Sequence, residues 1–459
     1  MRIQMIDKKY TYLLSQFVTR LQYKALSKKT IERTKDLIID HLGVTLYGSQ
    51  LEWSEKVRRL SINEMGKKES TIYGFGKVTA RAAALANGTA AHAAEFDDTH
   101  DESLGHPGAV IIPAAMAIAE KNNSSGSELL TAIIAGYEVQ CRVGSTVGRQ
   151  LIERGFHPTS VVGVFGSCAS AGKLLNLTTK QFESAFGSSA SMCGGVMQFS
   201  EDPVNTMIKR LHAGLPSERG ILAAQLSSIG FTGPNGAIEG QFGFAKVFTG
   251  VDQLNRITLD LGKKFEVDVI SVKIYPCCKQ FHALIEAIDL CKKQNPFRPQ
   301  DIQLIEPFGP SAMINAHMEK RPASMMAAQY SLPYVTAVAI LLDPTLPSSY
   351  DLISIKNKEL LKISDLVIPH IDKKLQPLYP KKFPAGVRIL LKNGTILTAT
   401  VLDSKGTQNN IITREEIVNK FHALTNNIYA KRKRNKIIDT VLNIDKAKSI
   451  GNLTSILKI

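Results

Sequence analysis

Hydrophobic residues recur with helical spacing along most of the first 260 residues. Residues 30–47 show the pattern clearly, because the apolar positions fall on one face of a helix: Ile31, Leu37, Ile38, Leu42 and Val44. The same spacing predicts helices over residues 127–143, 160–175 and 180–199, the first of them capped by Ser127. Residues 160–175 and 180–199 are rich in Gly, Ala, Ser and Cys, which predicts closely packed helices at the centre of a domain.

The pattern changes near residue 265. Residues 267–275 alternate and are β-branched, which predicts a strand, and residues 302–307 predict another. Two further runs predict a hairpin, 387–391 and 396–401, because Asn393-Gly394 between them is a strong turn signal.

Helices are expected between and after these strands, over 281–293, 333–342 and 414–424. We therefore predict a mainly α protein with two domains. A large all-helical domain spans 1–267 and is completed by 404–459, and a smaller α+β lid domain spans 268–403.

Composition narrows the possible partners. The chain has 459 residues, 44% of them hydrophobic, and a net charge of +15, which suits either nucleic acid or small anions. The strongest basic run, Lys431–Arg434, has only Tyr429 as an aromatic neighbour, and no zinc-finger or RRM signature accompanies it. A solvated helix face explains the run better, so we expect no nucleic-acid partner and favour an anionic small molecule.

The cysteines and the N-terminus indicate the compartment. Six cysteines are present and none forms a CxxC, which favours reduced thiols, and Cys277 and Cys278 are expected to be buried and inert. The N-terminus lacks an apolar signal-peptide core, and apolar runs such as 109–119 are too short to span a bilayer. We expect a soluble, cytoplasmic protein with no membrane partner.

The densest polar cluster lies between two alanine-rich segments. Residues 92–106 hold histidines and carboxylates in close succession: His92, Glu95, Asp97, Asp98, His100, Asp101, Glu102 and His106. A surface loop, a metal site and a catalytic loop in a cleft are all compatible with this composition. No spacing here matches a standard metal site, and no phosphate-binding glycine motif follows a strand anywhere in the chain.

Three other polar points stand out in apolar surroundings. His157 directly precedes a helix of small residues, where a capping role competes with a catalytic one. Lys209 and Arg210 suit carboxylate binding, although a solvated helix start explains them equally well. Lys273, at the end of the predicted strand 267–275, is a plausible anion ligand.

Five motifs in series resemble the MmgE/PrpD family: EFDDTH with GHPGAV, RGFHPTSVVGVFG, MIKRLHAG, KIYPCCKQFH and AQYSLPYVTAVA. They cover roughly residues 10–425. The family includes 2-methylcitrate dehydratases, cis-aconitate decarboxylases and iminodisuccinate epimerases. The resemblance implies a homodimer, a site between a helical domain and a lid, a di- or tricarboxylate substrate, and neither metal nor organic cofactor.

The resemblance also implies a set of site residues. Catalytic roles fall on Asp97, His106, His157, Lys273 and Tyr334, and substrate binding falls on Glu95, Thr99, Lys209, Arg210 and Cys278. Two positions depart from the decarboxylase pattern: Glu95 stands where an Asp is usual, and Cys278 stands where a His is usual. The His-Pro-Gly-Ala-Val segment beginning at His106 is nearer the decarboxylases than the dehydratases.

The three family reactions need similar groups. Each moves a proton to or from a carbon next to a carboxylate, so each needs an acid–base group and cations that hold the substrate. We predict that His106 carries the proton, that Asp97 or Glu95 orients it, and that Lys209 and Lys273 bind carboxylates. A lyase is expected, resembling cis-aconitate decarboxylase or 2-methylcitrate dehydratase. The alternatives are an epimerase and a non-enzymatic basic scaffold.

Overall fold

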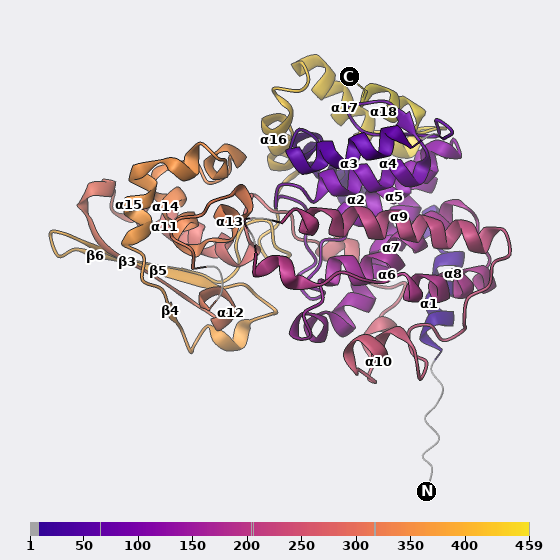
Figure 1. Cartoon of the computed structure of the whole chain (residues 1–459), viewed down its shortest axis with the longest axis horizontal. Helices are drawn as coiled ribbons and strands as arrows, with labels where there is room; N and C mark the ends of the chain where they lie inside the picture. The colour runs from indigo at the N-terminus through magenta and orange to yellow at the C-terminus, as the bar shows by residue number, and fades with distance from the viewer. Residues whose placement is uncertain (1–8, 65, 203, 205, 316–317, 459) are drawn as a thin grey trace, which may run out of the picture.

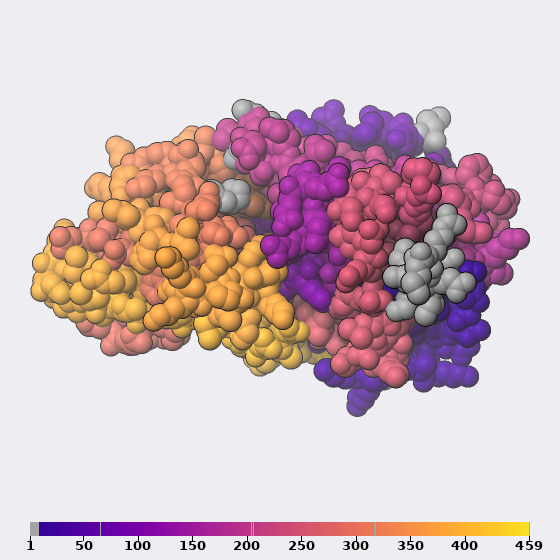
Figure 2. Space-filling view, turned by 90° about the horizontal axis from the view of Figure 1, so that it is seen from below, coloured from indigo at the N-terminus to yellow at the C-terminus, as the bar shows by residue number. Residues whose placement is uncertain are grey.

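The computed structural model describes residues 9–64, 66–202, 204, 206–315 and 318–458. Two bodies lie at opposite ends of an elongated molecule (Figures 1 and 2). The larger body contains helices and one short strand pair, β1 (Ser70–Thr71) with β2 (Lys77–Val78). Its helices are α1 (Tyr10–Arg20), α2 (Lys28–Gly48), α3 (Glu52–Asn63), α4 (Ala80–Ala91), α5 (Gly108–Lys121), α6 (Gly126–Glu153), α7 (Pro158–Leu174), α8 (Thr179–Ser191), α9 (Ile208–Ser228), α10 (Phe244–Thr249), α16 (Arg414–Thr425), α17 (Lys431–Leu442) and α18 (Gly451–Ile456).

Helix α7 forms the centre of the larger body and packs against α5, α6 and α9. Its small residues make this possible: a Cβ at Gly166 would lie 2.7 Å from the Gln140 Cβ of α6. Dense packing of this kind offsets the intrinsic cost of glycine in a helix, about 1 kcal/mol each. The predicted close packing of α7 is confirmed. Among the described residues, no helix is long and apolar enough to cross a membrane.

The smaller body, called the lid, has its own hydrophobic core, made by residues between 275 and 399. Its sheet has the order β4-β3-β5-β6, in which β3 and β4 are parallel and the other pairs antiparallel. Its elements are α11 (His282–Gln294), β3 (Ile302–Gly309), α12 (Ser311–Ile314), α13 (Met325–Tyr330), α14 (Leu332–Leu341), α15 (Lys358–Asp365), β4 (His370–Ile371), β5 (Ala385–Leu391) and β6 (Ile396–Val401).

The predicted hairpin is confirmed. Leu390 of β5 pairs with Ile396 of β6, and Gly394 takes a φ of 87° in the turn, a conformation that suits glycine. The chain then returns to the larger body, where α16 and α17 pack on α2. The prediction of a mainly α fold with a smaller α+β part is confirmed.

The strand predicted over 267–275 is wrong. Residues Glu266–Val269 form a 3-10 helix, and Ser271 makes only an isolated bridge to Thr99. The alternation reflects burial, because Val267, Ile270 and Val272 all enter the core of the larger body. The segment instead ties the loop around residue 99 to that core.

Two helix ends also differ from expectation. Helix α6 is capped by Ser125, not Ser127, through a capping box with Glu128. Helix α8 ends at Ser191, well before residue 199, and the chain then turns through Gly195 at a φ of 135°. The extended chain that follows runs beside His157, whose backbone N–H donates to the Gly195 carbonyl at 3.0 Å.

Candidate active site

A cavity of about 180 Å³ lies where the larger body meets the lid, and is called here the lid cavity. The larger body and the segment that leaves it contribute the lining residues Glu95, Thr99, His106, His157, Phe199, Lys209 and Lys273. The lid and its junction contribute Cys278, Lys279, Gln280, Tyr330, Tyr379 and Phe383. Most of the predicted site residues therefore converge here, although they come from segments far apart in the sequence.

Buried Glu95 is the centre of a cation cluster. Its carboxylate accepts from Lys209 and, at 2.7 Å, from Arg210, and lies 3.3 Å from the Lys273 Nζ. Lys209 and Arg210 occupy the first turn of α9, where a helix dipole disfavours cations, so their placement needs a nearby anion. Burial lowers the pKa of Lys209, and the neighbouring Arg210 and Lys273 lower it further.

The backbone at Glu95 is unusual. Its φ of 55° lies in the left-handed region, which a non-glycine residue enters only when its surroundings enforce it. Lys273 supplies this constraint, because its Nζ donates to the Glu95 carbonyl at 3.1 Å and also contacts the Glu95 carboxylate. Glu95 is therefore held by its backbone and its side chain together.

Asp97 holds two imidazoles beside the cavity. Its Oδ2 accepts a hydrogen bond from His92 Nδ1 at 2.7 Å and lies 3.2 Å from His106 Nδ1. Burial alone would raise the pKa of Asp97, but His106 and His92 outweigh it and hold this pKa well below its usual range. Asp97 is an anion placed to stabilise a protonated His106, which lines the lid cavity.

Hydrogen bonds to Asp98 hold the turn that carries His106 in place. Asp98 accepts from the Gly108 N–H at 2.8 Å and from the Tyr137 hydroxyl at 2.6 Å. A Cβ at Gly108 would lie 2.6 Å from that hydroxyl, so glycine is required at the start of α5. Burial raises the pKa of Asp98 to about 7 despite these hydrogen bonds.

His157 faces a second histidine. Its Nδ1 lies 3.1 Å from Nδ1 of His212, so one of these nitrogens must carry a hydrogen and the other must accept it. Burial, helped by His212 and His92, holds the pKa of His157 well below its usual value. A neutral His157 thus lines the cavity next to His106, their ring centres 6.5 Å apart.

Tyr334 is the predicted site residue that the structure places elsewhere. Its side chain is buried in the lid core and its hydroxyl donates to the Ser349 carbonyl at 3.1 Å. Tyr330, four residues earlier at the end of α13, lines the lid cavity instead, with the Lys209 ammonium 5.2 Å from its ring centre. Motif matching found the correct segment, but the break between α13 and α14 decides which tyrosine faces the cavity.

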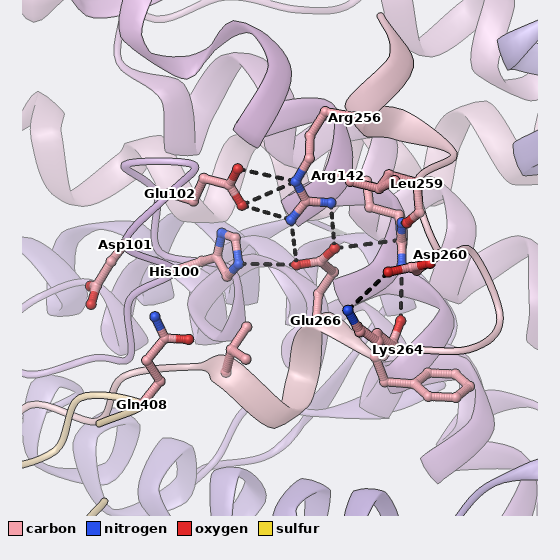
Figure 3. Close-up of a pocket in the computed structure, with 12 residues that line it drawn as sticks. His100, Asp101, Glu102, Arg142, Arg256, Leu259, Asp260, Lys264, Glu266 and Gln408 are labelled. Atoms are coloured by element: carbon pink, nitrogen blue, oxygen red, sulfur yellow. Dashed lines mark hydrogen bonds and ion pairs between the residues drawn. The ribbon is translucent and has the colours of Figure 1, made fainter. Parts of the chain in front are cut away.

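A neighbouring cavity of about 280 Å³ shares His100 and Asp101 with the lid cavity and is called the arginine cavity (Figure 3). Arg256 binds both Glu102 and Glu266, and buried Arg142 binds Glu138 at 2.7 Å. Burial would raise the pKa of Glu266, but hydrogen bonds from His100 and Arg256 lower it to about 2.

His100 belongs to this second network. Its Nδ1 accepts from the Ser103 N–H at 3.2 Å, and its Nε2 lies 3.2 Å from Glu266. Both ring nitrogens are therefore engaged in holding the loop. This histidine of the polar cluster is structural, whereas His106 faces the lid cavity.

Two groups of side chains have the spacing of metal ligands, with their ligand atoms within 4.8 Å of one another. They are His92, Asp97 and His106, and His100, Glu102 and Glu266. In the second group the carboxylates already bind Arg256, whose guanidinium competes with any cation. In the first group, Asp97 Oδ2 contacts both imidazoles and so orients them, while His92 Nε2 and Asp97 Oδ1 have no hydrogen-bond partner among the described residues.

Several side chains with no site role predicted from the sequence also belong to the site. His92 and His212 act through their contacts with Asp97 and His157, while Phe199 and Lys279 line the cavity directly. Phe199 enters because α8 ends early, and nothing in its local sequence signals this. His212 had a visible signal, since it follows Lys209 by three residues and so lies on the same side of α9.

Comparisons with known proteins agree with this geometry. Residues 13–257 match the MmgE/PrpD N-terminal domain, and residues 275–445 match the MmgE/PrpD C-terminal domain. Among curated relatives, a cis-aconitate decarboxylase of Aspergillus terreus is 27% identical over 97% of this chain and 95% of its own length. The cis-aconitate decarboxylase of Mus musculus is 28% identical over 99% of this chain and 94% of its own length. The chain belongs to the MmgE/PrpD family and is a lyase.

Proposed function

We propose that this lyase decarboxylates cis-aconitate to itaconate and CO₂. The observation that carries the proposal is the lid cavity, in which His106 beside Asp97 faces the same space as Lys209 and Lys273. Relatives from a fungus and from mammals bear the name cis-aconitate decarboxylase, and each aligns with nearly the whole chain.

The proposed reaction follows from these groups. Lys209 and Lys273 hold substrate carboxylates by charge-assisted hydrogen bonds. The carbon–carbon bond to one carboxylate breaks, CO₂ leaves, and the released electron pair forms the new terminal double bond. The displaced π-electron pair takes a proton from His106 at the carbon next to a remaining carboxylate. Asp97 stabilises the imidazolium before this transfer, and solvent reprotonates His106 afterwards.

Cys278 bears on the choice of proton carrier. It lines the cavity, and burial raises the pKa of its thiol, so it remains a neutral, poor acid. Cys278 therefore does not substitute for the histidine usual at this position, and proton transfer rests on His106. The neutral His157 is placed to hydrogen-bond a substrate carboxylate.

A substrate panel followed by proton NMR tests the proposal. Cis-aconitate, 2-methylcitrate and iminodisuccinate are incubated separately with the purified protein, before and after EDTA treatment. Itaconate from cis-aconitate, unchanged by EDTA, supports a metal-independent decarboxylase. Dehydration of 2-methylcitrate or epimerisation of iminodisuccinate, without itaconate, would replace the proposal with that activity. The homodimer stays a prediction, which light scattering at micromolar concentration tests.

A further inference from the structure

Lys279 is an enclosed cation without a protein acceptor. It begins the 3-10 helix Lys279–Phe281 at the junction with the lid, is only 7% exposed and lines the lid cavity. Its Nζ is shielded from solvent and makes no hydrogen bond or ion pair with any described residue. A buried ammonium without a partner destabilises the folded protein, so binding of an anion beside it is favourable.

The other cations of the cavity differ from Lys279. Lys209 and Lys273 both contact Glu95, as does Arg210 behind them. Three basic side chains share that one carboxylate, and Asp97 is the other acidic group acting on them, so basic groups outnumber acidic ones even before Lys279 is counted. The lid cavity is thus suited to a ligand with several negative charges.

Carboxylates near Lys279 are engaged elsewhere. Asp101 accepts hydrogen bonds from Thr99 and Ser271, and Glu286 accepts from the Lys405 N–H at 2.7 Å. Burial lowers the pKa of Lys279, while Asp101 opposes that shift from a distance without bonding to it. No described side chain therefore completes the environment of this ammonium.

We propose that Lys279 binds one carboxylate of the substrate, apart from those held at Lys209 and Lys273, and so selects a tricarboxylate over a dicarboxylate. The assignment rests on the proposed function, because it deepens the description of the same cavity. Lys279 acts in binding and recognition; the proton still passes through His106. A tricarboxylate supplies the acceptor that the folded chain lacks at this position.

Calorimetric binding tests the assignment without relying on turnover. The ligands are propane-1,2,3-tricarboxylate, glutarate, which lacks the central carboxylate, and methylsuccinate, which lacks a terminal one. Lys279→Met removes the charge and keeps the stem, and Lys279→Arg retains a charge. Lys292→Met is the matched control, since Lys292 is a partly buried lid lysine that donates to the Ala339 carbonyl outside the cavity.

Lys279→Met is expected to weaken tricarboxylate binding roughly 10- to 100-fold, the usual worth of a charge-assisted hydrogen bond, and to weaken at least one dicarboxylate less than threefold. Lys279→Arg should recover part of the loss, and Lys292→Met should bind like wild type. The melting temperature of Lys279→Met should equal or exceed that of wild type, because an uncompensated buried charge is removed.

Equal weakening of all three ligands, or a change below threefold for the tricarboxylate, would overturn the assignment. Failure of wild type to bind the tricarboxylate would overturn it together with the proposed substrate. Selective loss of tricarboxylate binding without itaconate formation from cis-aconitate would leave Lys279 in its role and reject only the decarboxylation. Itaconate formation by wild type, together with unchanged tricarboxylate binding by Lys279→Met, would support the decarboxylation and reject the role of Lys279.

Discussion

The two cavities on either side of the loop at residues 99–106 are both rich in charge, yet they are built in opposite ways. In the arginine cavity, Arg142 and Arg256 are fully engaged by carboxylates and backbone carbonyls (Figure 3). In and around the lid cavity, some buried polar atoms have no hydrogen-bond partner among the described residues, including the Lys279 Nζ and the His92 Nε2. Completed networks hold a structure in place, whereas unfinished ones leave room for a ligand. The arginine cavity, the larger of these two, is therefore the structural one.

The sharpest test of this comparison is His106→Gln. Loss of the acid–base group should lower kcat for cis-aconitate roughly 10²- to 10⁴-fold, while the melting temperature stays near that of wild type. Steady-state kinetics and thermal melting measure the two effects. His422→Gln, on α16 and outside both cavities, is the control and should behave as wild type. A kcat of His106→Gln within a few-fold of wild type would show that another residue transfers the proton.

Glu266→Gln should show the reverse behaviour in the arginine cavity. Neutralising Glu266 leaves Arg142 and Arg256 short of negative charge, and removing one partner of a buried ion pair costs about 3 kcal/mol. Urea unfolding should register this as a lower free energy of unfolding. Glu359→Gln breaks an exposed pair with Lys362 and should change stability by less than about 0.5 kcal/mol. Equal stability of the two variants would contradict a structural role for this network.

Asp98 should give stability a pH dependence. Burial raises its folded pKa to about 7, above its unfolded value of about 3.9, so the folded state binds the proton more tightly. The stability that this proton contributes is complete below about pH 4 and is lost as the pH rises through 7. Asp98→Asn should therefore remove roughly 2–3 kcal/mol of the decline in unfolding free energy between pH 5 and 7.5. Denaturant titrations at these two pH values test it, and parallel declines in both proteins would show that Asp98 stays ionised.

The smallest expected effect concerns His212, a positioning residue behind His157. His212→Leu removes the hydrogen-bond partner of the His157 Nδ1, and losing one hydrogen bond of about 1–1.5 kcal/mol corresponds to roughly a tenfold lower kcat. His212→Asn retains a polar group near the same place and should recover most of the rate. The ring-nitrogen NMR signals of His157 should shift in the Leu variant only. Equal rates in both variants would assign His212 to packing.

Several site residues were predictable because the residue types sit beside special backbone positions. His106 lies just before Pro107, the N-cap of α5, and His157 is itself the N-cap of α7, so each side chain lies at the start of a helix. Lys209 stood out as a cation within apolar surroundings. In each case the neighbouring residues in the sequence are enough to indicate the position of the residue in its helix.

Other features depended on partners that the local sequence does not reveal. Residues 267–275 have the composition of a strand, but within the described part of the chain no neighbouring strand pairs with them beyond the Thr99–Ser271 bridge. Tyr330 and Tyr334 share one motif, but the break between α13 and α14 and the packing of α14 in the lid core give them different surroundings. Nothing in the sequence around Lys279 signals its burial, which depends on the folded lid. Tertiary contact, and not propensity, decided these positions.

Glu95 has a consequence for how tightly any substrate can bind. Its carboxylate already occupies the cations that an incoming carboxylate would seek, so the chain contains its own competing ligand. Measured affinity is then a difference between two attractions to Lys209 and Lys273, and weakening the internal one strengthens the external one. The same charges also join the two bodies, since Arg210 bonds to Gln329 of the lid. Substrate exchange and the contact of the lid with the larger body therefore depend on one connected network of ion pairs and hydrogen bonds.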